Sequence, residues 1–538
     1  MPNPEIRYFD CFAAIGRRGG KDPEAPWTTE QLLAEMERCQ VHGALVFSHL
    51  AKEVHPAVGN PLVIEACNKN QRLYPCWVGI PHHTGESPHP DLLVKEMATN
   101  GVRALKIFPR HYKHVVDDRT LGKLLGALQE AKIVLIVDRG EWETAVQIEW
   151  TEVAWICQNF PDLTLLLHSV RWEATRHLVP IADQYPNLHF EFSNYQGNRM
   201  LEFWCGRIGH ERLLFGTQAL EKSIGAARAY VDYSDLSHEQ RHAIAGGNLQ
   251  RLLGLPDAPP PYSGKVAKDQ IVRQALSGKP ITDMPVIDAH AHIAQKGTRG
   301  AVMVAMNEAD AKGVVERNRK LGVTKTCVSA WTAIWTDYKL GNQDTILALQ
   351  EFPGEIVGFA VLDPNYVTDW EAECRYYYEE CGFQGMKPYF PRMSLPYNDP
   401  RYDPWWEYGN EHHLFALMHP SDNFKEEMLD LAKRFPNINF LLAHSGWTWR
   451  HARMHVEIAK KFPNCFLEIT FTSVTNGTIE YMVKELGSER VLYGSDAPMR
   501  DPFPQFGWVV YADISEEDKR NILGRNMQRI LSEVKVTR

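Results

Sequence analysis

Short runs of apolar and β-branched residues recur at regular intervals along the second half of the chain. They lie at Val286–Ile293, Lys325–Ala330, Ile356–Leu362, Phe383–Tyr389, Leu414–His419, Asn439–His444, Cys465–Thr470 and Arg490–Gly494. The segments between them, such as Glu426–Phe435 and Trp449–Phe462, carry apolar residues at helical spacing. Strands that alternate with helices predict a parallel sheet, and eight such units in about 250 residues predict a closed (β/α)8 barrel.

The first half of the chain shows the same order of apolar runs. Examples are Gly43–Ser48, Cys76–Ile80, Val102–Ile107, Ile133–Val137 and Leu188–Phe192. An open doubly wound sheet is the alternative, but the sequence has no Gly-rich dinucleotide-binding loop to support it. We therefore predict an α/β protein made of two tandem (β/α)8 TIM barrels.

An internal repeat relates the two halves. Y-F-D-C-F around Asp10 matches V-I-D-A-H around Asp288, and G-G-N-L-Q-R-L-L near Asn248 matches G-R-N-M-Q-R-I-L near Asn526. The separation from Asp10 to Asn248 is 238 residues, and the separation from Asp288 to Asn526 is also 238 residues. Words that match by chance would not keep this register, so we interpret the chain as a duplicated domain.

The join between the copies is rich in proline and glycine. The stretch P-D-A-P-P-P-Y-S-G begins at Pro256 and is followed by polar residues, which favours an irregular connection. We predict a first barrel at residues 1–258, a linker at 259–284 and a second barrel at 285–538.

Ligand-type side chains stand at the C-terminal ends of the predicted strands in the second half, where TIM barrels gather their catalytic residues. His290 and His292 end the first strand and, being two residues apart, point to the same side. His419 ends the fifth strand, and Asp496 follows the eighth. Each feature alone is weak, but together the imidazoles and the carboxylate predict one divalent ion, with Zn²⁺ preferred and Mn²⁺ or Fe²⁺ as alternatives.

Four sequence motifs, D-A-H-A-H, M-H-P, A-H-S-G and G-S-D-A-P, resemble those of the amidohydrolase superfamily. The resemblance covers almost the whole chain and is strongest to the branch that contains aminocarboxymuconate-semialdehyde decarboxylase and several sugar-acid and dicarboxylate lactonases. It implies that His290, His292, His419 and Asp496 bind one metal ion, and that His444 is a second-sphere catalytic residue that faces the substrate.

The first copy has lost every one of these ligand-type residues. Where the second copy has His290, His292, His419 and Asp496, the first copy has Phe12, Ala14, Asp138 and Gln218. Phenylalanine and alanine cannot bind a metal, so we expect the first barrel to be a metal-free pseudoenzyme domain. Lys106 and His168 persist at the positions of Lys387 and His444. Because Lys106 persists without a metal, we interpret Lys387 as a supporting or substrate-polarising residue of a mononuclear site.

We expect Asp496, His444 and Lys387 to carry the chemistry. Hydrolysis of an amide, another C–N bond or a lactone is the preferred interpretation, with a metal-activated water as nucleophile. Non-oxidative decarboxylation of an unsaturated or aromatic acid is the alternative, and a non-catalytic ligand-binding protein is a third.

Aromatic and basic residues in the loops after the strands suggest an aromatic or carboxylated substrate. The candidate substrate-binding residues are Trp331, Trp447, Arg392 and Arg450. The competing interpretation is that the tryptophans pack the loops against the outer helices and that the arginines are ordinary surface residues.

Charge and composition exclude several classes of binding partner. The net charge of -9 disfavours nucleic acid and anionic membranes, and no apolar run is long enough for a membrane span. The ten cysteines form no C-x-x-C pair and suggest a reduced, cytoplasmic protein. We expect a small-molecule substrate, an intramolecular pseudo-dimer of the barrels in which the loop His111–Arg119 reaches across, and in addition a homodimer as an open option.

Overall fold

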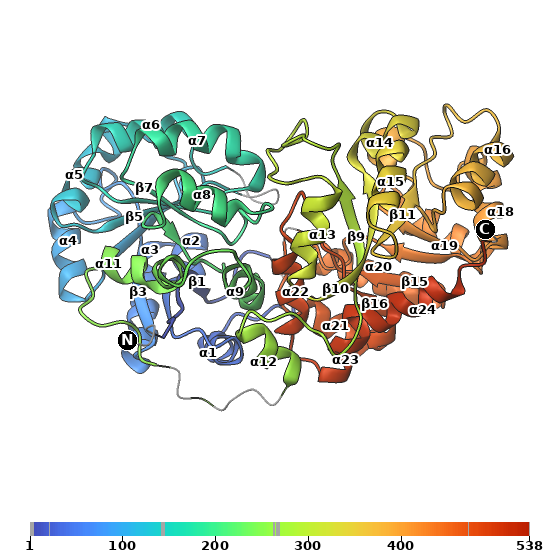
Figure 1. Cartoon of the computed structure of the whole chain (residues 1–538). Coiled ribbons are helices and arrows are strands. Elements are labelled where there is room, and N and C mark those ends of the chain that lie inside the picture. Colours follow the sequence, from blue (N-terminus) through green and yellow to red (C-terminus); the bar gives the residue numbers. More distant parts are fainter. Residues whose placement is uncertain are drawn as a thin grey trace. The chain divides into compact units, whose positions relative to one another are not determined.

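A computed structural model describes residues 5–20, 22–140, 146–261, 264, 269–471 and 473–536. The chain divides into two compact units, residues 1–266 and 267–538, called here the N-terminal and C-terminal barrels. Each contains an eight-stranded sheet whose strands follow one another in sequence order, and all strand pairs within it are parallel. Figure 1 shows the strands inside each unit and the helices around them. The predicted α/β fold of two tandem barrels is confirmed.

The N-terminal barrel alternates strands and helices throughout its length. Its strands are β1 (Phe9–Ile15), β2 (Gly43–Ser48), β3 (Leu73–Gly79), β4 (Ala104–Ile107), β5 (Val134–Asp138), β6 (Leu165–His168), β7 (Leu188–Glu191) and β8 (Leu213–Leu214). Its helices are α1 (Thr29–Arg38), α2 (His49–Glu53), α3 (Pro56–Lys69), α4 (Pro90–Thr99), α5 (Lys123–Glu130), α6 (Trp150–Asn159), α7 (Thr175–Gln184), α8 (Met200–Ile208), α9 (Ile224–Asp232), α10 (His238–His242) and α11 (Asn248–Leu252).

The C-terminal barrel repeats this order, and a strand lies within or across each of the eight predicted runs. Its strands are β9 (Val286–Ile293), β10 (Val323–Ala330), β11 (Ile356–Ala360), β12 (Gly385–Met386), β13 (Phe415–Met418), β14 (Asn439–Leu442), β15 (Cys465–Glu468) and β16 (Val491–Leu492). Its helices are α12 (Gln270–Leu276), α13 (Ala311–Arg319), α14 (Trp331–Trp335), α15 (Tyr338–Glu351), α16 (Trp370–Cys374), α17 (Phe390–Met393), α18 (Asp403–Glu411), α19 (Phe424–Arg434), α20 (Trp449–Lys461), α21 (Thr478–Leu486), α22 (Pro502–Val510), α23 (Glu516–Arg520) and α24 (Asn526–Glu533).

Backbone hydrogen bonds between the first strand and the segment around the last strand close the C-terminal barrel. The amide of Ala289 donates to the carbonyl of Tyr493 at 3.0 Å, and the amide of His292 donates to the carbonyl of Ala497 at 2.6 Å. In the opposite direction, the amide of Asp496 donates to the carbonyl of His290 at 2.7 Å. Closure therefore brings the chain around residue 496 next to the end of β9.

Large side chains from facing strands fill the interior of this barrel. The rings of Phe359 and Phe415 pack edge to face with their centroids 5.2 Å apart. Gly385 on β12 lies between them, and a Cβ atom there would approach Phe359 to 2.4 Å and Phe415 to 2.8 Å. The sequence therefore needs glycine at this position because the phenylalanines occupy the space of a side chain.

The helices around the C-terminal barrel pack through one apolar face, as their sequence pattern predicts. In α19, Phe424, Met428 and Leu431 are buried at helical spacing, while charged residues cover most of the remaining surface. The predicted helical stretches Glu426–Phe435 and Trp449–Phe462 correspond to α19 and α20.

One helix lies within the segment predicted as a linker, residues 259–284. This helix, α12, begins after Asp269, whose side chain accepts from the amide of Val272 at 3.2 Å. The other oxygen of Asp269 lies 2.6 Å from Nζ of Lys519. Ile271 and Ala275 are buried, and α12 packs against α22 and α23 of the C-terminal barrel. Part of the segment after residue 266 is thus structure of the second unit.

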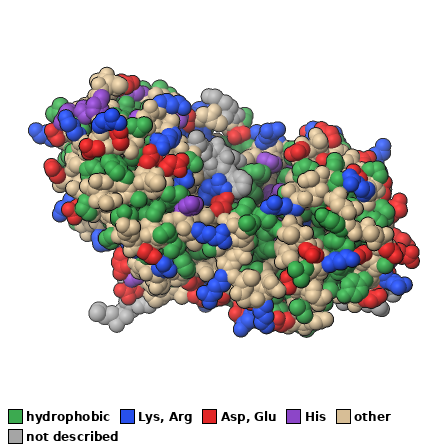
Figure 2. Space-filling model, turned by 90° about the horizontal axis from the view of Figure 1, so that it is seen from above, with side chains coloured by type: hydrophobic (Ala, Val, Ile, Leu, Met, Phe, Trp, Pro, Cys, Tyr) green, Lys and Arg blue, Asp and Glu red, His purple; other side chains and the backbone are tan. Residues whose placement is uncertain are grey.

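Basic and acidic side chains are both exposed at the surface. Figure 2 shows lysine and arginine interspersed with aspartate and glutamate on the visible face. Among the described residues, the helices are too short or too polar to cross a bilayer.

We predict that His455→Gln makes the C-terminal barrel less sensitive to acid. Oγ of Ser445 donates to the carbonyl of Leu442 and so accepts from Nδ1 of His455, at 2.8 Å and 2.9 Å. Burial, with a smaller effect of the neighbouring His451, lowers the pKa of His455 from 6.5 to about 3. Between these pH values the unfolded chain binds a proton that the folded chain does not. Stability therefore falls as the pH decreases, at most by about 1.4 kcal/mol per pH unit.

The variant lacks this contribution. Urea unfolding between pH 6.5 and about 4.5 measures the unfolding free energy of both proteins. As the pH falls, the unfolding free energy of the wild type should decrease more than that of the variant. A difference that does not depend on pH would contradict the prediction.

Candidate metal centre

Two histidines of β9 and one aspartate after β16 form a compact group of potential metal ligands. His290 and His292 are two residues apart on β9, so both side chains leave the same side of the strand. Their Nε2 atoms lie 3.9 Å and 3.3 Å, respectively, from Oδ1 of Asp496. The ligand atoms of the three residues lie within 4.8 Å of one another, and all three residues are buried. The structure thus brings these three predicted residues together.

A hydrogen bond at the other ring nitrogen orients each histidine of this group. Nδ1 of His290 lies 2.8 Å from Oε2 of Glu468, and Nδ1 of His292 lies 3.0 Å from Oγ of Ser329. When Nδ1 is protonated and donates, Nε2 keeps its lone pair for a metal ion. Burial lowers the pKa of both imidazoles. Neutral imidazoles with oriented lone pairs fit a divalent ion.

Sequence reasoning missed Glu468, which ends β15. Oε2 of Glu468 contacts His290. Oε1 accepts from the amide of Thr470 at 2.8 Å and also from the hydroxyl of Thr470. Burial raises the pKa of Glu468 to about 7, although the hydrogen bonds from Thr470 act in the opposite direction. Glu468 also forms a possible ligand group with His290 and His444, but it occupies the Nδ1 side of His290. We therefore assign it to orienting that ring.

Asp288 has a similar supporting position and was noted in the sequence only as part of the repeat. Its Oδ1 accepts from the amides of Ser495 and His290 at 3.0 Å and 3.1 Å. Its Oδ2 accepts from Asn318 at 3.0 Å and from the hydroxyl of Ser495 at 2.5 Å. These bonds tie the start of the D-A-H-A-H motif to the G-S-D-A-P motif. The position of Asp288 at the start of the first motif is the sequence feature that could have indicated this supporting role.

Asp496 makes a second contact that the sequence did not predict. Its Oδ2 is hydrogen-bonded to the guanidinium of Arg500, and both side chains are buried. Burial alone would raise the pKa of Asp496, but Arg500, His292 and His290 together hold it far below its usual value. The backbone of Asp496 has a φ of 59°, in the left-handed region that aspartate tolerates better than most residues. The carboxylate is therefore an anion at neutral pH with one oxygen toward the histidines.

His419 and His444 border the same space. Their ring centroids are 5.0 Å apart, and the His444 ring lies 5.3 Å from that of His290. Nδ1 of His444 donates to the carbonyl of Thr470 at 2.7 Å, and Nδ1 of His419 lies 3.0 Å from the carbonyl of Pro420. Burial, and then the charge of Lys387, lower the pKa of His419 to about 4. His419 lies outside the group with ligand atoms within 4.8 Å, so its role as fourth ligand stays a prediction.

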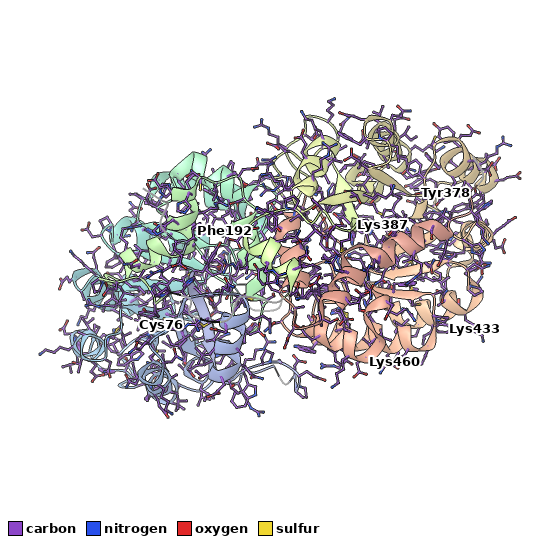
Figure 3. The ribbon with its side chains drawn as sticks, turned by 60° about the horizontal axis from the view of Figure 1, so that its bottom comes forward. Cys76, Phe192, Tyr378, Lys387, Lys433 and Lys460 are labelled. Carbon is purple, nitrogen blue, oxygen red and sulfur yellow. The ribbon has the colours of Figure 1, made fainter. Side chains whose placement is uncertain are left out.

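Lys387, directly after β12, places an amine in this buried space. Its exposed fraction is 0%, and among the described residues its Nζ has no hydrogen-bond partner. Burial lowers the pKa of Lys387 to about 8, although the charges of Asp496 and Glu468 favour the protonated form. Figure 3 shows Lys387 inside the C-terminal barrel, whereas Lys433 and Lys460 lie toward its periphery. A buried ammonium without an acceptor is costly, so the site is suited to an anionic ligand.

The two tryptophans predicted to bind substrate lie close to the ligand group. Trp331 is buried, and its ring centroid is 5.1 Å from that of His292. Trp447 stacks on Phe471 at 4.3 Å, and Phe471 in turn lies 5.1 Å from His444. Both tryptophans can therefore shape the apolar wall of the site.

The two predicted arginines are placed differently. The guanidinium of Arg392 lies 3.9 Å over the ring of Trp335, whose centroid is 5.5 Å from that of Trp331. Arg450 is exposed on the first turn of α20, and no contact found in the described residues joins it to the metal ligands.

In the N-terminal barrel, aromatic rings and an ion pair occupy the corresponding space. Nζ of Lys106 lies 2.7 Å from Oδ1 of Asp138 and 3.2 Å from Nδ1 of His168. Phe12 stacks on His168 at 4.2 Å and lies 3.9 Å from the Lys106 ammonium. A hollow of about 40 Å³ remains, lined by Phe12, Asp138 and Gln218 among others. The potential metal-ligand groups found in the described residues all lie in the C-terminal barrel.

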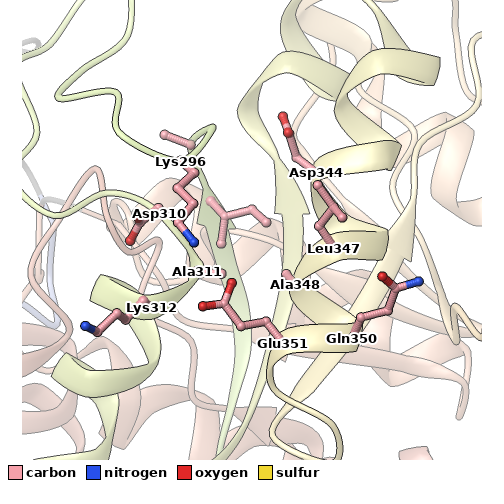
Figure 4. A pocket seen from close by; sticks show the side chains of 11 residues that line it. Lys296, Asp310, Ala311, Lys312, Asp344, Leu347, Ala348, Gln350 and Glu351 are labelled. Carbon is pink, nitrogen blue, oxygen red and sulfur yellow. The ribbon is translucent and has the colours of Figure 1, made fainter.

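A further hollow of about 390 Å³ lies between the start of α13 and the outer face of α15. Figure 4 shows Lys296, Asp310 and Glu351 around it, with Leu347 and Ala348 on the α15 side. No predicted metal ligand and no predicted substrate-binding residue lines it. The hollow is therefore separate from the candidate metal centre.

A closed parallel barrel that gathers imidazoles and a carboxylate beyond the C-terminal ends of its strands defines a class of metal-dependent TIM-barrel enzymes. Residues 287–532, which make up most of the C-terminal barrel, match the family model described as amidohydrolase.

Solved structures similar to part of the chain include a putative amidohydrolase from Staphylococcus aureus, with 15% identity over 46% of this chain and 100% of that chain, at a TM-score of 0.38. A dihydroxybenzoic acid decarboxylase from Polaromonas sp. JS666, with bound manganese and 2-nitroresorcinol, has 17% identity over 46% of this chain and 97% of that chain, at a TM-score of 0.36. A 2,6-dihydroxybenzoate decarboxylase from Rhizobium has 16% identity over 46% of this chain and 99% of that chain, at a TM-score of 0.36. A comparison with curated proteins found no match.

We predict that His292→Ala abolishes high-affinity binding of a divalent ion. The change removes one of the two neutral imidazoles whose Nε2 atoms lie beside Asp496, and so leaves too few converging protein ligands for tight binding. Glu468→Gln should weaken binding by about 10- to 100-fold, because it weakens the orientation of His290. Metal content after dialysis and titration with Zn²⁺ or Mn²⁺ measure both effects.

His177→Ala is the matched control, because His177 is an exposed histidine of the N-terminal barrel. It should bind metal as the wild type does. Full metal occupancy in His292→Ala would show that the ion is held elsewhere.

Proposed function

We propose that the C-terminal barrel is a metal-dependent decarboxylase of a small unsaturated or aromatic acid. One ion, Zn²⁺ or Mn²⁺, would be held by His290, His292, His419 and Asp496. The ion would supply positive charge that polarises an oxygen of the substrate. The neighbouring tryptophans suit a flat substrate, and the hydroxylated benzoic acids named for the compared decarboxylases supply a first panel for screening.

The buried amine of Lys387 carries this proposal. Its Nζ is enclosed at the site without a hydrogen-bond partner among the described residues. In decarboxylation the bond to the carboxylate breaks, CO₂ leaves, and the electron pair stays on the substrate before the carbon takes a proton. A protonated Lys387 can stabilise the developing negative charge and then donate that proton, which it later regains from solvent.

The carboxylates of the site are poorly suited to activating water. Oδ2 of Asp496 is bonded to Arg500, and Oδ1 faces the histidines. Glu468 is bonded to His290 on one side and to Thr470 on the other. The expectation that Asp496 takes a proton from water during hydrolysis therefore loses support, which moves our preference from hydrolysis to decarboxylation.

Hydrolysis of an amide or lactone is the second candidate, and His444 favours it. Because Nδ1 of His444 donates to the carbonyl of Thr470, Nε2 keeps a lone pair. Burial lowers the pKa of His444 well below its usual value, which keeps the ring neutral. A neutral imidazole at this position can act as the base that hydrolysis requires.

The test is a substrate screen on the metal-loaded full chain that separates the two reactions. Carboxyl-¹³C-labelled hydroxybenzoic and other unsaturated acids should release ¹³CO₂, and in D₂O the product should carry deuterium at the carbon that lost CO₂. In a parallel screen of amides and lactones in H₂¹⁸O, ¹⁸O incorporation without gas release would instead establish hydrolysis.

Lys387→Met should lower kcat by at least about 100-fold while the metal stays bound, because it removes charge stabilisation at the reacting group. Lys433→Met is the matched control, because Lys433 is exposed on α19 and distant from the site in Figure 3. An unchanged kcat in Lys387→Met with normal metal content would contradict the proposed role of this residue.

A further inference from the structure

We propose that a hollow linked to the metal centre through Trp331 and Trp335 binds a carboxylate of the substrate that is not the reacting one, and that Arg392 recognises it. The hollow has a volume of about 410 Å³, which is large enough for part of a small ligand. It is lined by residues 333–339, 363, 365, 366, 392 and 393. The inference rests on the proposed function, because it concerns the substrate of the same site.

The hollow lies on the catalytic face of the barrel. Its three lining segments lie in the connections that follow β10, β11 and β12. In parallel barrels these ends face the same side as the metal ligands. A substrate bound at the metal centre can therefore extend toward this hollow.

Aromatic rings connect the hollow to the metal centre. The ring of Trp331 lies 5.1 Å from His292 and 5.5 Å from Trp335. Trp335 lines the hollow and carries Arg392 on its face at 3.9 Å. A flat ligand can follow this surface, and the exposed ring of Tyr366 offers a further apolar contact within the hollow.

Arg392 is a cation without a carboxylate partner in the described part of the chain. Stacking on Trp335 fixes the plane of the guanidinium while its N–H groups remain available at the edge. The other cation of the hollow, Lys339, is already paired with Glu373 at 3.0 Å. Arg392 is therefore the group in the hollow that is ready to form a bidentate pair with a carboxylate.

The acidic residues of the hollow are engaged in their own turns. Asp337 caps α15 by accepting from the amide of Leu340 at 3.0 Å. Asp363 accepts from the amide and from the side chain of Asn365, both at 2.9 Å. Neither is paired with Arg392, and their negative charge restricts an incoming carboxylate to the side of the guanidinium.

The test measures how Arg392 couples to one carboxylate of a ligand. The probes are isophthalate, which has two carboxylates, and its monomethyl ester, which has one. For the metal-loaded wild type, calorimetry should give about 10- to 100-fold tighter binding of the diacid, as expected for one charge-assisted bidentate pair. Arg392→Ala should remove this preference, and Arg392→Lys should restore only part of it because lysine lacks the planar fork.

Arg319→Ala is the matched control. Arg319 is also exposed, but it lies on α13 outside the hollow, and its guanidinium is paired with Glu355 at 2.7 Å. It should keep the preference for the diacid. Thermal unfolding and metal content verify that each variant is folded and loaded.

The same comparison in His292→Ala separates the hollow from the metal centre. The preference for the diacid should persist there, although both probes bind more weakly. An equal preference in wild type and Arg392→Ala, its loss in His292→Ala, or no binding to the wild type up to about 10 mM would overturn the inference. If the preference for the diacid depends on Arg392 but the substrate screen releases no CO₂, only the proposed reaction is overturned. If CO₂ is released but the preference does not depend on Arg392, only the role of Arg392 is overturned.

Discussion

The hydrogen bonds that close the C-terminal barrel are the constraint on which the candidate metal centre depends. Asp496 is far from His290 in sequence, yet its amide donates to the carbonyl of His290, and the amide of His292 donates to the carbonyl of Ala497. Asp288 reinforces this seam through its bonds to Ser495. The two motifs D-A-H-A-H and G-S-D-A-P are therefore parts of one backbone junction, and the position of each ligand follows from closing the barrel.

Closure also determines the electrostatics of the site. It buries imidazoles, carboxylates and an amine in a space where an isolated charge is costly. The structure compensates part of this cost by pairing Asp496 with Arg500 and by hydrogen-bonding Glu468 to Thr470. Within the described parts of the chain, Lys387 is left without such a bond. The charges of Asp496 and Glu468 offset part of the cost of its burial, and we take the missing hydrogen bond as the strongest indication of an anionic substrate.

The sequence predicted the fold well because strand period, helix period and repeat all indicate the same architecture. It also indicated which residues end strands, and so which side chains can meet at one face. It could not show the partners Glu468 and Arg500, because those contacts depend on side-chain directions after closure. The same limit applies to Arg392 and Arg450, which look alike in sequence. In the described structure, Arg392 lies over the ring of Trp335 and lines a hollow, whereas Arg450 is exposed on the first turn of α20.

The N-terminal barrel shows which parts of this arrangement belong to the fold rather than to a metal. There, Asp10 bonds to Thr217 as Asp288 bonds to Ser495, and the buried Glu191 occupies the same place on its strand as Glu468. This frame persists without a group of metal ligands in the described residues of that barrel. Lys106, the counterpart of Lys387, persists as well, but Oδ1 of Asp138 lies 2.7 Å from its Nζ. The open acceptor position at Lys387 is thus not a requirement of the barrel. At the position of Asp138, the C-terminal barrel has His419. This exchange provides a potential metal ligand and, in the proposed function, leaves the ammonium of Lys387 for the substrate.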